Sequence, residues 1–340
     1  MTAEAKKGIR EALRKTLDEV FGAEDPKSPI GGPWGMVINA HNTWKAPARL
    51  NHELFLQLRG QFSDNIIREI LLAAAGIKIS RTCLSDRKLE LLQGIADLHG
   101  FHLVASNARF ILRRDKGKGG WSNSIDRVIG PNEENGLRNV YIASDASLAE
   151  AGRLLEEAGM DELFGALLGV PPCCREAYER FQAAAQAKQN DFVSLVLENT
   201  PGSIPYDPWV NYMAQYFGRS MLSFFPCTFR CAAASIAAKS TFEMLAGCDA
   251  AWAHSFLELH QTNILYTENL GLHLFRQPLS DGSIRYGPHD VDSTEPTEAA
   301  TLIRQGDRLE VHGKRQVTIY RGSEQIGTLE GEDVGMCVFW

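Results

Sequence analysis

Two close pairs of cysteines constrain the fold of this chain more than any other feature of its sequence. One pair is the dipeptide Cys173-Cys174 in GVPPCCREAYERF, and the other is Cys227 with Cys231 in FFPCTFRCAAAS. Each pair follows a proline and precedes a stretch with helical periodicity, which predicts that both pairs lie at helix N-termini. The free N–H groups and the positive end of the helix dipole favour the thiolate there. Both pairs therefore lie where a metal or cluster is most easily bound.

The spacing within each pair bears on what the thiolates can hold. In a helix, Cys227 and Cys231 would share one face with their side chains ~6 Å apart, because four positions separate them. The adjacent Cys173 and Cys174 cannot share a helix face in that way. They span two corners of a cluster more easily than they chelate one small ion.

Four interpretations of these cysteines are open. The first is a [4Fe–4S] cluster, because four thiolates match its ligand count. The second is a structural zinc site, although the usual C-x₂₋₄-C spacing of such sites fits the adjacent pair poorly. The third treats the cysteines as small buried apolar residues, and the fourth is a redox-active vicinal disulfide. We take the cluster, with Cys173, Cys174, Cys227 and Cys231 as its ligands, as the leading hypothesis and Zn²⁺ as the alternative.

The other cysteines and the chain as a whole indicate a reducing compartment. The sequence has seven cysteines in 340 residues, and an odd number in a chain of this length argues against a disulfide framework. We interpret Cys83, Cys248 and Cys337 as core residues. The N-terminal stretch has basic residues but no apolar segment after them, and no apolar run reaches the ~18 residues of a membrane span. We therefore expect a cytoplasmic protein with no membrane segment.

Two segments resemble motifs of an uncharacterised prokaryotic protein family. LLGVPPCCREAYERF is similar to a G-Y-P-x-C-C motif, with Val170 in place of the tyrosine, and FFPCTFRC is similar to a P-C-x-x-x-C motif. The resemblance covers about residues 167–239, and it implies that the four cysteines act as one site without implying a substrate. The dipeptide followed by a close pair also resembles the ligand pattern of assimilatory sulfate-reductase-type [4Fe–4S] proteins. The later pair here departs from that pattern in being C-x₃-C.

Hydrophobic periodicity predicts an α+β protein in three parts. Region 1–158 has α/β texture, 159–267 is a helical core that carries the cysteines, and 268–340 is a small β meander or barrel. Helices are predicted at 3–22, 86–99 and 148–158, the last with a capping box of Ser147 and Glu150, and one or two helices are predicted at 50–76. Strands are predicted at 35–40, 77–80, 101–106, 109–114 and 139–144, and 115–136 is predicted as a loop. The core is predicted to be helical over 160–267 apart from a break at 199–209.

The composition limits the classes of function. Apolar residues make up 44% of the chain and charged residues 23%, which is ordinary for a folded globular protein and argues against a disordered chain. The formal net charge is −7, which argues against nucleic acid as the partner.

Side chains close to the cysteines in sequence are candidates for binding a small-molecule substrate. Cations beside the cysteines would offset the charge of a cluster or bind an anion, and polar and aromatic residues between the pairs would wall a pocket. The segment PYDPW can equally be interpreted as a helix N-terminus with Asp207 as its N-cap. The candidates are Arg175, Asp207, Trp209, Asn211, Arg230 and Lys239, together with His41, which follows a predicted strand.

Three functional hypotheses follow from these residues. The first is a small-molecule redox or tailoring enzyme that uses the cluster and receives electrons from a donor protein. The second is a non-catalytic interaction protein stabilised by zinc. The third is a metal-free enzyme with a reactive thiolate and a histidine base such as His41 or His254.

Overall fold

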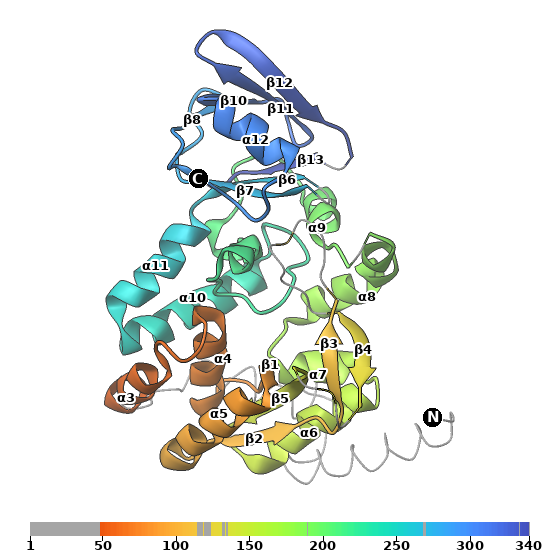
Figure 1. Ribbon diagram of the computed structural model, residues 1–340, viewed down its shortest axis with the longest axis vertical. Coiled ribbons are helices and arrows are strands. Elements are labelled where there is room, and N and C mark those ends of the chain that lie inside the picture. Colours follow the sequence, from red (N-terminus) through yellow and green to blue (C-terminus); the bar gives the residue numbers. More distant parts are fainter. Residues whose placement is uncertain are drawn as a thin grey trace, which may run out of the picture. The chain divides into compact units, whose positions relative to one another are not determined.

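A computed structural model describes most of the chain, and its described residues fall into two compact units (Figure 1). The described residues are 48–113, 118, 124–130, 133, 135–188, 190–267, 270–332 and 334–339. Unit 1 comprises those up to Ile111 with Ile125–Arg175 and Gly247–Asp249, and unit 2 comprises those in Leu112–Ser124, Glu176–Ala246 and Ala250–Trp340. The predicted helix 3–22, the predicted strand 35–40 and His41 lie outside the described residues, as does part of the predicted loop 115–136. The division into three parts at 158 and 267 stays a prediction.

Unit 1 is built on an antiparallel sheet with helices packed against it. The strands are β1 (Ser80–Ser85), β2 (His102–Ala105), β3 (Arg109–Leu112), β4 (Ile125–Ile129) and β5 (Leu137–Ala143). The helices are α3 (Ala48–Leu58), α4 (Asp64–Ala74), α5 (Asp86–His99), α6 (Ala146–Glu157) and α7 (Asp161–Leu167). Strand β5 is central, since β1 pairs with one side of it and β2 and β3 with the other. The buried side chains of β5, α6 and α7 form one apolar core, with Tyr141 and Phe164 in edge-to-face contact.

The helix predicted at 86–99 is confirmed as α5, and the predicted segment 50–76 contains two helices, α3 and α4. The predicted capping box at α6 is wrong. Asp145 is the N-cap, and its carboxylate accepts a hydrogen bond from the Ser147 N–H at 2.8 Å. Glu150 pairs with Arg153 on the helix surface and does not reach back to Ser147. Aspartate and serine are comparable N-cap residues, and in the structure the earlier of the two caps the helix, which begins at Ala146 rather than at 148.

A cluster of buried charges joins α4 to the start of β1 in unit 1. The Glu69 carboxylate accepts hydrogen bonds from Arg68 at 2.8 Å and from Lys78 at 2.6 Å. The side chains of these three residues are each less than a tenth exposed. The Ser80 hydroxyl donates to the Glu69 backbone carbonyl at 2.9 Å, and this bond connects the first residue of β1 to α4. Burial is the largest influence on the Glu69 carboxyl and acts to raise its pKa, but Lys78 and Arg68 together outweigh it and lower the pKa to about 2.

Unit 2 begins with helices, and its middle is less helical than the periodicity predicts. Before residue 263 its helical elements are the body of α8 (Pro172–Ala187), α9 (Val193–Asn199), η2 (Pro208–Val210), η3 (Tyr212–Phe217), most of α10 (Ala232–Cys248) and α11 (Ala250–His260). Residues 200–231 contain two short 3₁₀ helices and otherwise no helix or strand, and 263–267 is a strand. The break predicted at 199–209 is present but extends to residue 231, so the prediction of helix is wrong for 210–231 and for 263–267. None of the helices in the described part of the chain has both the length and the apolar composition needed to cross a membrane.

The C-terminal part of unit 2 is the predicted strand-rich region. Its strands are β6 (Asn263–Thr267), β7 (Gly271–Phe275), β8 (Ser283–Arg285), β9 (Val291–Ser293), β10 (Arg308–Val311), β11 (Gln316–Arg321), β12 (Glu324–Glu330) and β13 (Val334–Cys337). They form two four-stranded antiparallel sheets, ordered β12-β11-β10-β8 and β13-β6-β7-β9. The successive strands β10, β11 and β12 are a meander, so the α+β fold with a C-terminal meander is confirmed. Apolar residues of both sheets share one core.

Helix α12 (Glu298–Gln305) interrupts this strand-rich tail, and the sequence analysis missed it. It packs on β7, β11 and β12, as Figure 1 shows. The signal was present in the sequence, because Thr297 is a good N-cap residue and its hydroxyl accepts from the Ala300 N–H.

Candidate metal centre

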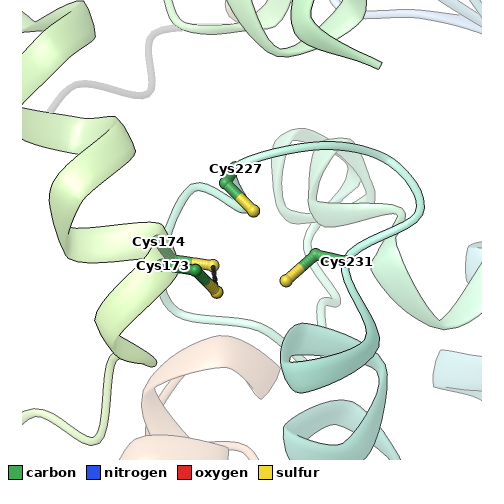
Figure 2. Close-up of side chains that lie close together, drawn as sticks. All are labelled: Cys173, Cys174, Cys227 and Cys231. Carbon is green, nitrogen blue, oxygen red and sulfur yellow. Dashed lines mark hydrogen bonds between the residues drawn. The ribbon is translucent and has the colours of Figure 1, made fainter. Parts of the chain in front are cut away.

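The four cysteines predicted to act together lie at one place in the structure. Their sulfur atoms are all within 4.8 Å of one another, and Figure 2 shows them directed toward a common point. The Sγ atoms of Cys173 and Cys174 are 3.9 Å apart. Cys173 is exposed, Cys227 is half-buried, and Cys174 and Cys231 are buried. Within the described part of the chain, no other cluster of three or more cysteine, histidine, aspartate or glutamate residues is arranged to hold a metal.

The first turn of α8 positions Cys173 and Cys174, as the sequence predicts. Pro172 is the first helical residue, where its missing N–H costs nothing and its fixed φ suits a helix. The N–H groups of Cys174 and Arg175 both donate to the Pro171 carbonyl, at 2.9 and 3.0 Å. Helix α8 then runs without a break into unit 2, since the boundary between the units falls after Arg175. The body of the helix therefore sets where these two sulfur atoms lie.

A stack of aromatic rings connects α8 to the segment that carries Cys227. Tyr178 lies four residues after Cys174 and stacks on Phe192 with ring centroids 5.0 Å apart. Phe192 stacks in turn on Phe225 at 4.3 Å. Phe225 precedes Cys227 by two residues, and each such ring pair stabilises the arrangement by about 0.5–1.5 kcal/mol beyond its buried area. The stack thus fixes the segment at Cys227 against the helix that carries the other pair.

Cys227 and Cys231 do not lie within a helix, and the prediction that they share a helix face is wrong. Helix α10 begins at Ala232, and residues 218–231 form neither helix nor strand. Cys231 directly precedes the helix, and its sulfur accepts a hydrogen bond from the Ala234 N–H at 3.5 Å. This is the position and role of an N-cap side chain, and it favours the thiolate. Pro226, which precedes Cys227, lies within this irregular segment and does not start a helix.

Two polar residues that the sequence analysis missed hold this irregular segment in place. The Asn199 amide donates to the Cys227 carbonyl at 2.8 Å. The Thr200 hydroxyl accepts from the Phe229 N–H at 2.9 Å, and it donates to Val196 in α9. No local sequence signal marks Asn199 or Thr200, because their partners are about thirty positions away. The two phenylalanines before Pro226 were the available sign of the aromatic stack.

The two arginines predicted to bind substrate make hydrogen bonds to backbone carbonyls. Arg175 donates to the Val170 carbonyl at 2.7 Å, and its buried Nε has no hydrogen-bond partner among the described residues. Arg230 donates to the carbonyls of Ser203 and Pro205 and lies over the Tyr206 ring. The contacts of Arg230 hold the loop that precedes η2, and the contact of Arg175 reaches the segment that precedes α8. A substrate role for either arginine stays a prediction.

The other candidates lie around η2 and α10. Asp207 is the N-cap of η2, and its carboxylate accepts from the Trp209 N–H at 3.0 Å, which agrees with the interpretation of PYDPW as a helix start. Asn211 is buried and donates to the His260 carbonyl at 3.0 Å. Lys239 is exposed, and its ammonium lies 5.7 Å from the centre of the Trp209 ring. None of these side chains belongs to the cysteine cluster, and their binding of a substrate stays a prediction.

No described histidine joins the cluster either. His254 lies on α11, where its Nδ1 hydrogen-bonds to the Ala250 carbonyl at 2.7 Å and its ring packs against Phe242. His41 lies outside the described residues. The described donors at the centre are therefore four sulfur atoms, without the imidazole base that a thiol enzyme requires.

The remaining cysteines differ from these four in environment. Cys248 and Cys337 are buried, as predicted for core residues, and Cys83 is half-buried with its thiol 3.4 Å from the Asn139 amide oxygen. Burial raises the pKa of the Cys248 thiol and that of the Cys337 thiol to about 12. Burial also raises the pKa of Cys83. All three are therefore thiols at neutral pH and poor ligands or nucleophiles.

This contrast predicts the pattern of alkylation. In the folded, metal-depleted protein at pH 8, iodoacetamide should modify Cys173 first, because it is exposed and lies at the start of a helix. Cys337 should stay unmodified, because a thiol with a pKa of about 12 is ionised in only about one molecule in 10,000 at this pH. Peptide mass spectrometry over time measures the two rates, with a urea-unfolded sample as the control in which both react. Equal rates in the folded protein would contradict the assignment.

Comparisons with known proteins add no assignment: no protein-family model, no curated protein and no solved structure matches this chain. The resemblance over about residues 167–239 stays a prediction.

Proposed function

We propose that this protein is a metalloprotein whose centre is held by the thiolates of Cys173, Cys174, Cys227 and Cys231. The observation that supports this is the distance of at most 4.8 Å between any two of their sulfur atoms. Thiolates are soft ligands that select zinc, copper(I) or iron over magnesium, calcium and manganese. Free thiolates persist in a reducing compartment, so we place the protein in the cytoplasm.

The spacing of the sulfur atoms favours a single tetrahedral ion as the occupant. Four thiolates on one zinc ion, each at about 2.3 Å, have their sulfur atoms ~3.8 Å apart. The 3.9 Å between Cys173 and Cys174 fits this value, and the 4.8 Å limit requires only a small contraction. A closed site of four cysteines is typical of structural zinc, which stabilises a fold and leaves no open position for a substrate. Zinc is therefore the leading occupant, with a stabilising role between α8 and the segment 227–231.

A [4Fe–4S] cluster in a small-molecule redox or tailoring enzyme is the second candidate. Such a cluster places iron and sulfide between the cysteines, so their sulfur atoms must stand farther apart than on one ion. Cys227 lies in an irregular segment and Cys173 is exposed, so both can move outward without unfolding the body of a helix. The exposed Cys173 would also let an electron-donor protein approach the cluster. A [4Fe–4S] cluster therefore requires the four sulfur atoms to move apart, whereas a zinc ion does not.

Metal analysis of anaerobically purified protein tests both candidates. A structural zinc site predicts one zinc ion per chain and a colourless solution. A [4Fe–4S] cluster predicts a brown solution with about four irons and about four sulfides per chain. The Cys174→Ala variant should lose the metal in either case, because it removes a buried ligand. A protein that holds no metal, even after supply of zinc or of iron and sulfide, would overturn the proposal.

Cys337→Ala is the matched control for this experiment. It removes a buried cysteine of unit 2 that lies outside the cluster, so its metal content should equal that of the unmodified protein. Loss of metal from this variant as well would show that the loss follows general destabilisation rather than loss of a ligand.

A further inference from the structure

The four ligands are unequal in their access to solvent. Cys173 is exposed, whereas its neighbour Cys174 is fully buried and Cys231 is 6% exposed. A thiolate bound to metal remains a nucleophile, and oxidation of cysteine selects thiolates that are accessible and that have a second thiol nearby. Cys173 meets both conditions, since three other sulfur atoms lie within 4.8 Å of it.

Geometry distinguishes the three sulfur atoms that could form a disulfide with Cys173. Cys174 is adjacent in sequence, and adjacent Cα atoms are about 3.8 Å apart across a trans peptide. Ordinary disulfides join Cα atoms about 4.4–6.8 Å apart, so a bond to Cys174 would strain the first turn of α8. Cys231 is buried and its sulfur accepts the Ala234 N–H at the start of α10. Cys227 is half-buried in a segment without helix or strand. Of the three cysteines, it can therefore approach Cys173 with the least distortion of the fold.

We propose that Cys173 is an oxidation site for small hydroperoxides and that Cys227 is its resolving partner. This inference rests on the proposed metal centre. The Cys173 thiolate attacks one oxygen of the hydroperoxide, the O–O bond breaks, and the departing oxygen takes a proton and leaves as an alcohol or as water. Cys173 then carries a sulfenic acid. The Cys227 thiolate attacks that sulfur, an S–S bond forms, and the hydroxyl group leaves with a proton as water.

Oxidation of this pair removes two of the four ligands. One hydroperoxide accepts the two electrons that the two thiolates lose, and the metal ion keeps only Cys174 and Cys231. A four-cysteine zinc site needs its full ligand set for tight binding. The reaction therefore ends in release of the ion, and a reducing thiol reverses it by restoring both thiolates.

The test uses metal-loaded protein and hydrogen peroxide as the probe. Metal release is followed with a chromogenic chelator, and the oxidised protein is digested with trypsin under non-reducing conditions. Trypsin separates the ligands, because Cys173 and Cys174 lie in peptide 154–175, Cys227 in peptide 220–230 and Cys231 in peptide 231–239. The expected product joins 154–175 to 220–230. A link to 231–239, or a loss of two hydrogens within 154–175, would overturn the assignment of Cys227.

Two histidine variants separate oxidation of Cys173 from general damage to the centre. Histidine replaces cysteine as a zinc ligand in three-cysteine sites, so Cys173→His and Cys231→His should both retain the ion. Cys173→His lacks the oxidised sulfur, and its peroxide-driven release should be slower by about tenfold or more. Cys231→His keeps both reacting sulfur atoms and should release metal at nearly the original rate. Equal release from the unmodified protein and Cys173→His would overturn the inference.

The outcomes also separate this inference from the proposed function. A protein that binds metal but keeps it under peroxide supports the metal centre and overturns the oxidation site. A protein that binds no metal overturns both.

Discussion

Chelation of the metal is expected to lower the free energy of unfolding by about 4 kcal/mol, relative to protein kept at a free metal concentration about 1,000 times Kd. The reason is linkage, because the four sulfur atoms come together only in the folded chain and the ion therefore binds the folded state alone. Urea unfolding at two buffered concentrations of free zinc measures the difference. The midpoint should shift while the slope of the transition stays the same.

Two variants sharpen this measurement. Cys174→Ala should respond to neither zinc nor chelator, and it should unfold somewhat below the midpoint of the chelated protein, because it also leaves a cavity where a buried side chain stood. Cys337→Ala should have a lower baseline stability, because it leaves a cavity in the core, but it should keep the full dependence on free zinc. An identical midpoint for the unmodified protein with and without chelator would contradict a stabilising metal.

The second large effect is expected in unit 1, where Glu69→Gln should destabilise the protein by about 3–5 kcal/mol. The substitution leaves Arg68 and Lys78 buried without the carboxylate that accepts from both of them. Thermal or urea unfolding measures the loss. Glu157→Gln is the matched control, because Glu157 pairs with Arg153 but is 40% exposed. Its effect should stay within about 1 kcal/mol, as for other surface ion pairs.

The same carboxylate predicts how stability depends on acid. The pKa of Glu69 is about 2 in the folded protein, against 4.5 as its ordinary value. Because the folded pKa is the lower one, the contribution of Glu69 is complete above pH 4.5 and is lost as the pH falls toward 2. Glu69→Gln should remove this part of the pH dependence. An unchanged acid-unfolding slope in the variant would contradict the role given to Glu69.

Local sequence patterns predicted the regular elements better than the connections between them. Helix α5 follows from periodicity, since its buried residues Leu92, Ile95 and Ala96 lie on one face. Strands β10 to β12 follow from short strand-forming runs separated by turns that contain glycine. Residues 200–231 are also rich in apolar side chains, and periodicity assigned them partly to helix. In the structure the Tyr212 ring contacts the rings of both Phe225 and Phe229, which are 13 and 17 positions away in the sequence. A window of local sequence contains no information about such contacts.

The same distinction between local patterns and long-range contacts applies to the metal centre. Its four ligands were recognisable because thiolate chemistry, close spacing and the preceding prolines are all local features. The arrangement of Cys227 and Cys231 outside a helix was not, because it depends on Asn199 and Thr200 in another segment. The hydrogen bonds of Arg175 and Arg230 to backbone carbonyls were equally hidden, since a charged side chain in sequence does not reveal its acceptor.

The position of the ligands along the chain gives the metal a role in the order of folding. The two pairs lie on either side of residues 175–226, so the ion closes a long loop whose ends must first be brought together. That approach requires α8 and the aromatic stack between Tyr178, Phe192 and Phe225 to be in place. Four-coordinate binding therefore waits until the intervening segment has folded. During refolding, four-coordinate metal binding should therefore be complete only once this part of unit 2 has folded.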